Sequence, residues 1–134
     1  MVVDASALID MLVPPEPTVR DFLWERLPTA ATPWIAPEVL TFEVLAVARR
    51  RTLRGEWPER AATAAVREAL EFPLELVPMR PLAAGAWMRR HSVTAADALY
   101  LELAIAADEP FLTTDRRLAR AATAAGIQAV CPPP

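Results

Sequence analysis

The sequence contains no lysine, and each of its 14 basic residues is an arginine. This absence excludes two classes of enzyme, because a P-loop needs a lysine on the nucleotide phosphates and a Schiff-base enzyme needs a lysine amine. Abundant arginine together with abundant alanine is typical of coding bias in a GC-rich genome. The alternative interpretation is selection for phosphate contacts, since the planar guanidinium group suits phosphate binding.

Cysteine, histidine and long apolar runs are also scarce. Cys131 is the only cysteine, so no internal disulfide can form and a reducing cytoplasm is the expected location. His91 is the only histidine, which excludes an acid–base pair of two histidines. No apolar run reaches the ~20 residues of a membrane-spanning helix, and Met1–Asp4 lacks the features of a signal peptide.

The 134 residues, 54% of them hydrophobic, are enough for one domain with its own core. Strand-like segments alternate with helical ones, and the expected strands are Met1–Asp4, Trp34–Ala36, Leu74–Val77, Phe111–Thr114 and Ile127–Cys131. This alternation predicts an α/β fold, with a central parallel sheet covered by helices on both faces. We expect a single domain over residues 1–134, with Pro132–Pro134 as a frayed tail.

Four acidic residues are the strongest sign of chemistry in the sequence. Asp4 and Asp115 each follow a strand-like segment, Glu43 interrupts an apolar helix, and Asp97 lies just inside a helix start. Ligands of parallel α/β folds bind beyond the carboxyl ends of the strands. Carboxylates repel one another and resist burial, so several of them at one sheet edge require a cation. The pattern therefore predicts a metal site.

Three of these acids have a structural alternative. Thr94 and Asp97 have the spacing of a capping box, and Asp115 and Asp4 are suitable N-caps. Glu43 is harder to explain in this way, because its helical neighbours are apolar and a desolvated carboxylate costs several kcal/mol unless it is paired or bound to metal. The remaining alternatives for Glu43 are a position at the rim of the helix or an internal salt bridge to an arginine.

The segments around the four acids are Val3-Asp4-Ala5-Ser6-Ala7-Leu8, Glu38-Val39-Leu40-Thr41-Phe42-Glu43-Val44, Thr94-Ala95-Ala96-Asp97-Ala98-Leu99-Tyr100 and Leu112-Thr113-Thr114-Asp115-Arg116-Arg117-Leu118. In this order and spacing they resemble the PIN-domain family, and within it the VapC-type ribonuclease toxins of bacterial toxin–antitoxin pairs. Each segment alone is a weak motif, but the four in order are specific and span nearly the whole chain. The resemblance implies a three-layer PIN-like fold.

The resemblance also implies a metal-dependent endoribonuclease. The implied catalytic and metal-binding residues are Asp4, Glu43, Asp97 and Asp115. The ion would be Mg²⁺ or Mn²⁺, and it would activate water to cleave an RNA phosphodiester, leaving 5′-phosphate and 3′-hydroxyl ends. Ser6 and Thr113 take positions close to the metal, although capping or turn hydrogen bonds are an equally good interpretation of both.

Arginines near these motifs are candidates for contact with RNA, against the alternative of a solvated helix face. The candidates are Arg89, Arg90, Arg116, Arg117 and Arg120. Arg49–Arg51 ends the Glu43 helix, where positive charge interacts favourably with the helix dipole. The resemblance further implies two protein partners, a VapB-type antitoxin lying across the active site and a second copy of the chain. No membrane partner is expected.

The apolar side chains that could form such interfaces are Val19, Phe22, Leu23, Trp24, Trp57 and Trp87, for which we prefer the core. A phosphotransferase of the haloacid dehalogenase type is excluded, since it needs a second aspartate where Ser6 stands and also a lysine. A receiver module fails on the same lysine. Two alternatives stay open: a PIN-type nuclease acting in RNA maturation, and a non-enzymatic interaction domain.

Overall fold

The computed structural model describes every residue from Met1 to Pro134. In chain order its elements are β1 (Val2–Val3), α1 (Ala5–Leu12), α2 (Pro17–Trp24), β2 (Trp34–Pro37), α3 (Val39–Leu53), α4 (Glu59–Glu71), β3 (Leu74–Val77), the 3₁₀ turn η1 (Arg80–Leu82), α5 (Ala83–Met88), α6 (Ala95–Ala107), β4 (Phe111–Leu112), α7 (Arg116–Ala124) and β5 (Ala129–Val130). The predicted alternation of strands and helices is confirmed. No helix combines the length and the apolar character needed to cross a membrane.

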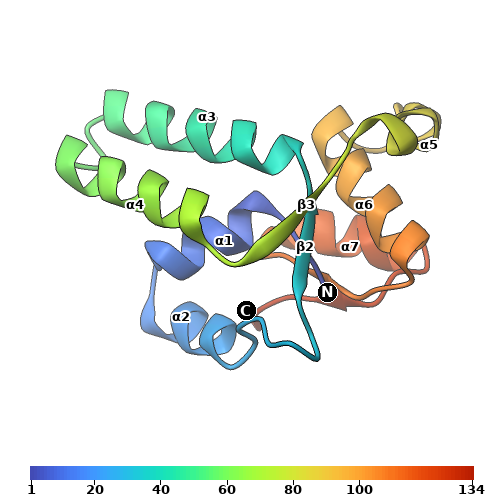
Figure 1. Cartoon of the computed structure of the whole chain (residues 1–134), viewed down its shortest axis with the longest axis horizontal. Helices are drawn as coiled ribbons and strands as arrows, with labels where there is room; N and C mark the ends of the chain where they lie inside the picture. The colour runs from blue at the N-terminus through green and yellow to red at the C-terminus, as the bar shows by residue number, and fades with distance from the viewer.

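The five strands form one sheet in the order β3-β2-β1-β4-β5, and every neighbouring pair is parallel. Parallel crossovers are right-handed, so α1 to α4 cover one face of the sheet and α5 to α7 cover the other. Figure 1 shows these two helical layers to the left and to the right of the strands. The predicted three-layer α/β architecture is therefore confirmed.

The direction in which strands are added to the sheet reverses at β1. The chain passes from β1 to β2 and β3 on one side, and then returns to β4 and β5 on the other side. The β1–β4 boundary is therefore a topological switch point, where the loops after two adjacent strands diverge to opposite faces. Asp4 follows β1 directly, and Thr113 to Asp115 follow β4.

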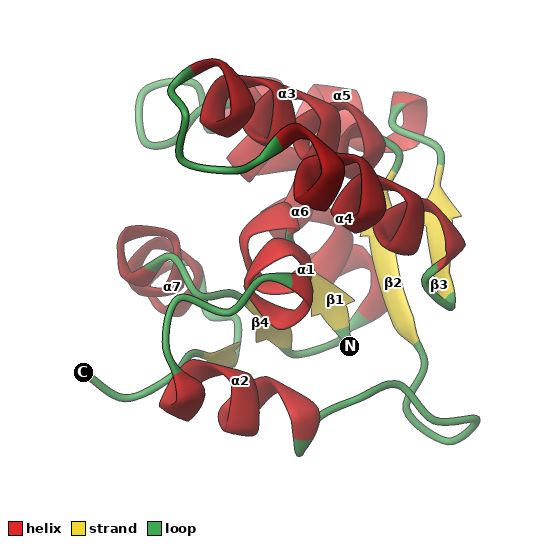
Figure 2. Cartoon of the chain, turned by 90° about the vertical axis from the view of Figure 1, so that its left-hand side faces the viewer, coloured by secondary structure: helices red, strands yellow, loops and turns green.

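The two strands at the switch point are buried on both faces. Val2, Val3, Phe111 and Leu112 are fully buried, as expected for inner strands of a parallel sheet between two helical layers. Helix α6 packs against β1, β2 and β4. Figure 1 shows α1 and α6 on opposite sides of the strands, and in Figure 2, which looks from the side of α1, the two helices overlap next to β1. This central packing fixes the backbone immediately before Asp4 and Asp115.

The structure differs from the sequence prediction between residues 81 and 91. The sequence predicts one helix from Pro81 to about His91, whereas the structure has the 3₁₀ turn η1 up to Leu82 and the helix α5 only as far as Met88. The carbonyl of Arg89 accepts hydrogen bonds from the backbone N–H groups of Ser92 and Val93 and turns the chain before α6 begins. At the carboxyl end Pro132 is buried, whereas Pro133 and Pro134 are exposed.

The assignment of the tryptophans to the core is wrong for two of them. Trp24 is 59% exposed and Trp87 is 67% exposed, because each lies on the outer surface of a short helix. Trp57 is half-buried against the core, and Leu23 is fully buried. The apolar face of α2 therefore reaches the core through Leu23, whereas its last residue, Trp24, faces solvent.

Candidate active site

A cavity of about 250 Å³ opens at the carboxyl ends of β1 and β4. It is lined by Asp4, Ala5, Ser6, Ile9, Asp10, Glu43, Val47, Arg50, Arg51, Asp97, Tyr100 and Asp115. All four acids singled out in the sequence are among these residues, although they come from four separate segments of the chain. The structure therefore brings the predicted quartet together in one place.

Asp4 is the most buried of the four acids, with 4% of its surface exposed. Its Oδ1 accepts hydrogen bonds from the Ser6 hydroxyl (2.7 Å) and from the N–H of Ala7 (2.9 Å), so Asp4 also caps α1. Its Oδ2 accepts a hydrogen bond from the Thr113 hydroxyl at 2.6 Å. Burial raises the pKa of Asp4 to about 7, and the three hydrogen bonds reduce this effect without cancelling it.

The Ser6 and Thr113 hydroxyls join the ends of β1 and β4 around Asp4. Their oxygens lie 3.2 Å apart. Ser6 accepts a hydrogen bond from the N–H of Thr114, and Thr113 accepts one from the N–H of Asp115. Both hydroxyls therefore position an acid of the cavity and also form the expected turn hydrogen bonds, whereas their role close to a metal stays a prediction.

Glu43 extends from α3 and is held by a neutral donor. The Tyr100 hydroxyl of α6 donates a hydrogen bond to Glu43 Oε1 at 2.7 Å. Burial raises the pKa of Glu43, and the nearby charge of Asp97 acts in the same direction. Burial and the Glu43 charge also raise the pKa of Tyr100, which keeps its hydroxyl protonated as a donor. No arginine forms an ion pair with Glu43.

Asp97 and Asp115 lie at the rim of the cavity and share one arginine. Arg117 places a guanidinium nitrogen 2.8 Å from Asp97 Oδ2 and 3.4 Å from Asp115 Oδ2. The predicted N-cap at Asp115 is present, since its carboxylate accepts from the N–H groups of Arg117 and Leu118. The predicted capping box is only half formed, because Thr94 accepts from the N–H of Asp97 but the Asp97 carboxylate does not accept from the N–H of Thr94. Capping therefore orients the Asp115 carboxylate, whereas Arg117 orients that of Asp97, and neither contact excludes a further role.

The donor chemistry of the cavity fits a hard divalent cation, since carboxylate and hydroxyl oxygens are ligands that Mg²⁺ and Mn²⁺ prefer. As the side chains stand, however, no three acidic, histidine or cysteine groups are arranged to hold an ion. Arg117 accounts for part of this difference, because its guanidinium group takes an oxygen of Asp97 and one of Asp115. The residues present therefore fit a metal in the chemistry of their donor atoms, while two of the four carboxylates are paired with Arg117.

Comparisons with known proteins identify the fold family. The PIN-domain family model matches residues 1–124. The chain belongs to the PIN-domain family. Ribonuclease VapC3 of Mycobacterium tuberculosis is 38% identical over 121 residues, which cover 90% of this chain and 86% of the relative. Ribonuclease VapC1 of the same organism is 39% identical over 125 residues, covering 90% and 89% of the two chains.

Two solved structures share the architecture of this PIN domain. PAE2754 from Pyrobaculum aerophilum superposes with a TM-score of 0.70 at 21% identity, over 96% of this chain and 82% of that one. Mycobacterium tuberculosis VapC20, described as a toxin that cleaves the sarcin–ricin loop, superposes with a TM-score of 0.67 at 19% identity, over 90% and 93% of the two chains. These likenesses confirm the predicted fold.

Four polar residues of the cavity were not singled out as site residues from the sequence: Asp10, Arg50, Arg51 and Tyr100. Each lies on the same helical face as a predicted site residue. Asp10 follows Ser6 by four positions, Tyr100 follows Asp97 by three, and Arg50 and Arg51 follow Glu43 by seven and eight. The helical period alone could have found them.

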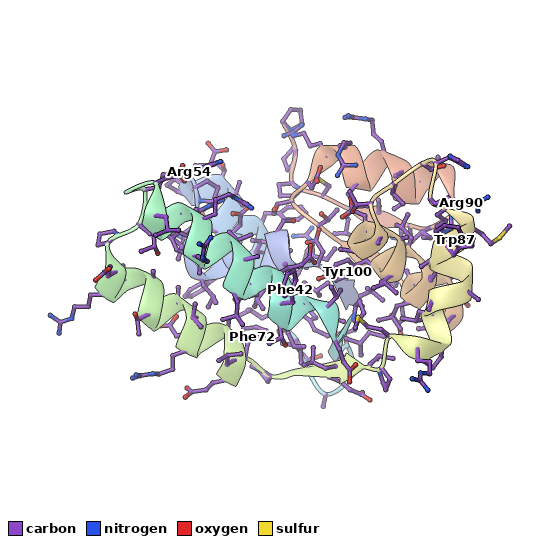
Figure 3. The ribbon with its side chains drawn as sticks, turned by 90° about the horizontal axis from the view of Figure 1, so that it is seen from above. Phe42, Arg54, Phe72, Trp87, Arg90 and Tyr100 are labelled. Carbon is purple, nitrogen blue, oxygen red and sulfur yellow. The ribbon has the colours of Figure 1, made fainter.

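The five arginines proposed for RNA contact lie outside the lining of the cavity. Arg89 forms an ion pair with Glu102 at 2.6 Å, and the Arg90 guanidinium lies over the ring of Trp87. Figure 3 shows Trp87 and Arg90 at the outer edge of the molecule, whereas Tyr100 lies near its middle. Arg116 and Arg120 are exposed on α7. RNA contact by these residues and by Arg117 stays a prediction.

Proposed function

We propose that this PIN domain is a metal-dependent endoribonuclease and the toxin of a toxin–antitoxin pair. The single observation that carries the proposal is the meeting of four acids, from four distant segments, in one cavity at the switch point of a parallel sheet. The identity of 38–39% to two proteins named as VapC ribonucleases, over 90% of the chain, supports RNA as the substrate class.

In this proposal Asp4, Glu43, Asp97 and Asp115 hold Mg²⁺ or Mn²⁺. When bound, the ion would supply an activated water and offset the charge that develops on the scissile phosphate. The Ser6 and Thr113 hydroxyls fix the rotamer of Asp4, and the Tyr100 hydroxyl fixes that of Glu43. Three uncharged donors thus orient carboxylates without neutralising them, which keeps their negative charge available to a cation.

Binding of a metal at the site would also be coupled to the release of a proton from Asp4. Burial holds its pKa at about 7, so the metal-free protein carries a proton on this carboxyl for much of the time near neutral pH. A cation beside the carboxylate favours the ionised form, so Asp4 releases a proton as the site is loaded. The apparent affinity for the metal therefore rises as the pH increases through this range.

We also propose a VapB-type antitoxin and a second copy of the chain as partners. The support is the relationship to VapC ribonucleases, together with large apolar side chains that lie exposed on the surface, among them Trp24, Phe42, Leu53 and Trp87. Co-purification of the chain with the product of an adjacent small reading frame tests the antitoxin, and light scattering of the isolated chain tests the dimer.

The enzymatic proposal is tested by incubating the purified chain with single-stranded RNA in Mg²⁺ or Mn²⁺, with and without a chelator. We expect chelator-sensitive cleavage that leaves 5′-phosphate and 3′-hydroxyl ends. Glu43→Gln and Asp97→Asn should abolish cleavage, whereas Glu38→Gln, at an exposed position just before α3, should not. Chelator-resistant cleavage, or wild-type rates in both site variants, would show that the assignment is wrong.

A further inference from the structure

The cavity contains two arginines whose role the acidic quartet does not explain. Arg50 and Arg51 lie in the last turn of α3 and line the same cavity as the four acids and Asp10. Charge at the end of a helix favours the macrodipole, and that interaction requires no particular direction of the side chain. Their position on the cavity wall therefore needs a second reason.

Neither arginine is neutralised by a close carboxylate. The ion pairs in the structure involve Arg20, Arg26, Arg54, Arg89, Arg117 and the terminal amine, but not Arg50 or Arg51. Burial raises the pKa of Asp10, and the positive charge of Arg51 acts in the opposite direction. Arg51 thus lies near an acid without being bound by it, and its N–H groups keep their capacity to donate.

Contacts with the turn that follows α3 also hold Arg51 in place. The chain turns after α3 at Gly55, whose φ of 73° lies in the left-handed region that glycine adopts readily. The turn lets the Arg51 carbonyl accept the N–H groups of Glu56 and Trp57, at 2.9 and 3.3 Å. Trp57 is thereby placed beside Arg51, and the Arg51 guanidinium carbon lies 5.1 Å from the centre of the indole ring.

This packing leaves the N–H groups of Arg51 able to contact an anion. A guanidinium group over an aromatic ring uses its face for the ring and leaves its edge, which carries the N–H donors, free for a phosphate. The sequence contains no lysine that could make such contacts. RNA entering a cavity lined by five carboxylates needs fixed positive charge next to the metal site, since each backbone phosphate adds a negative charge.

We propose that Arg51, assisted by Arg50, is a positioning residue that binds an RNA backbone phosphate next to the one that is cleaved. The inference rests on the proposed nuclease function and adds the part of the site that holds the substrate. Arg51 does not touch the reacting atoms. Arg51 fixes the position of the RNA strand over the carboxylates, and Trp57 keeps the Arg51 guanidinium group extended towards the cavity.

Arg49 is a matched control on the same helix. It lies two residues before Arg51, so the two side chains point about 200° apart around the helix. Arg49 lines a groove between α3 and α4 together with Thr52 and Glu59, and it does not line the acidic cavity. Arg49→Gln and Arg51→Gln therefore remove the same charge from the same helix turn on different faces.

Binding is measured in an Asp97→Asn background, in which the RNA stays intact in the presence of Mg²⁺. The readout is the fluorescence anisotropy of a labelled single-stranded RNA at several salt concentrations. Arg51→Gln should weaken binding on the order of tenfold and lower the slope of log affinity against log salt by about one. Arg51→Lys should restore part of the affinity, and Arg49→Gln should leave affinity and slope unchanged.

Kinetics in the otherwise wild-type chain give the second readout. Arg51→Gln should raise KM while kcat stays nearly constant, because the lost contact binds substrate and transition state equally. The thermal midpoint of Arg51→Gln should match that of Arg49→Gln. Two results overturn the inference even if the wild type cleaves RNA. One is equal RNA affinity for these two variants. The other is a decrease of both kcat and the thermal midpoint in Arg51→Gln. If the wild type does not cleave RNA but Arg51→Gln alone weakens binding, the proposed activity fails, and only the inferred contact of Arg51 with an RNA phosphate stands. A chain that neither binds nor cleaves RNA overturns both.

Discussion

Replacing the buried carboxyl Asp4 with asparagine should make the metal-free protein more stable at neutral and alkaline pH. The pKa of Asp4 is about 7 in the folded chain, against 3.8 for the same group in a model peptide. At 1.36 kcal/mol per pKa unit, this difference corresponds to roughly 4 kcal/mol of instability when the group is ionised. Asp4→Asn removes the charge and keeps nearly the same shape.

The sign of the pH dependence follows from which state binds the proton. Between pH about 4 and 7 the folded chain keeps the Asp4 proton while the unfolded chain has released it, so the free energy of unfolding of the wild type falls as the pH rises. In Asp4→Asn this contribution is absent. The variant and the wild type should therefore differ little near pH 4, and the variant should be more stable by up to roughly 4 kcal/mol near pH 8.

The local hydrogen bonds tolerate the substitution. An asparagine oxygen still accepts from the Ser6 hydroxyl and the N–H of Ala7, as Asp4 Oδ1 does. The amide nitrogen then faces Thr113, whose hydroxyl turns from donor to acceptor and can donate instead to Ser6, 3.2 Å away. The exchange weakens this network, so the value of 4 kcal/mol is an upper bound.

The assay is urea unfolding followed by tryptophan fluorescence, with a chelator present, at pH values from about 4 to 8. Asp21→Asn is the control, since Asp21 is exposed on α2 and pairs only with its neighbour Arg20. Saturating Mg²⁺ should stabilise the wild type at alkaline pH and should have little effect on Asp4→Asn. Parallel curves of stability against pH for wild type and Asp4→Asn would refute the account of Asp4 as a buried, destabilising acid.

Three further substitutions test the groups around the acids. Tyr100→Phe removes the donor to Glu43, and it should cost about 1–2 kcal/mol in urea unfolding and shift the pH profile of cleavage to higher pH. Thr113→Val removes a fully buried donor to Asp4 and should cost about 2–3 kcal/mol in the same unfolding assay at alkaline pH. Arg117→Gln frees the two carboxylates that Arg117 bridges, so calorimetry should show Mn²⁺ binding several-fold more tightly; unchanged affinity would mean that Arg117 does not compete with the ion.

The sequence was sufficient for the fold because each inner strand is a short apolar run that directly precedes a helix or a turn. Val2 and Val3 read as a buried strand and are fully buried in β1, and Phe111 and Leu112 behave in the same way in β4. The sequence did not predict the helix break near Arg89. The break depends on two backbone hydrogen bonds to the Arg89 carbonyl, and the amino-acid composition of the segment does not indicate them.

For the site, the sequence predicted the acids but not most of their partners. Capping motifs placed Asp97 and Asp115 at helix starts, and both positions are confirmed. The bridge between these two carboxylates through Arg117 could not be predicted, because it requires the starts of α6 and α7 to meet at the sheet edge. Local signals fix a residue's element, whereas the packing of elements decides its partner.

Glu43 shows most clearly what such packing adds. The sequence left a position at the helix rim or an arginine salt bridge as its structural alternatives. The structure shows a half-buried Glu43 whose partner is the Tyr100 hydroxyl, from a residue 57 positions away. A neutral donor fixes the direction of the carboxylate but leaves its charge uncompensated, and burial raises the pKa of Glu43 for the same reason. An arginine partner would have completed the charge balance within the protein. Its absence leaves a half-buried negative group directed into a cavity with four other acids, and this uncompensated charge is the reason for proposing a bound cation as its partner.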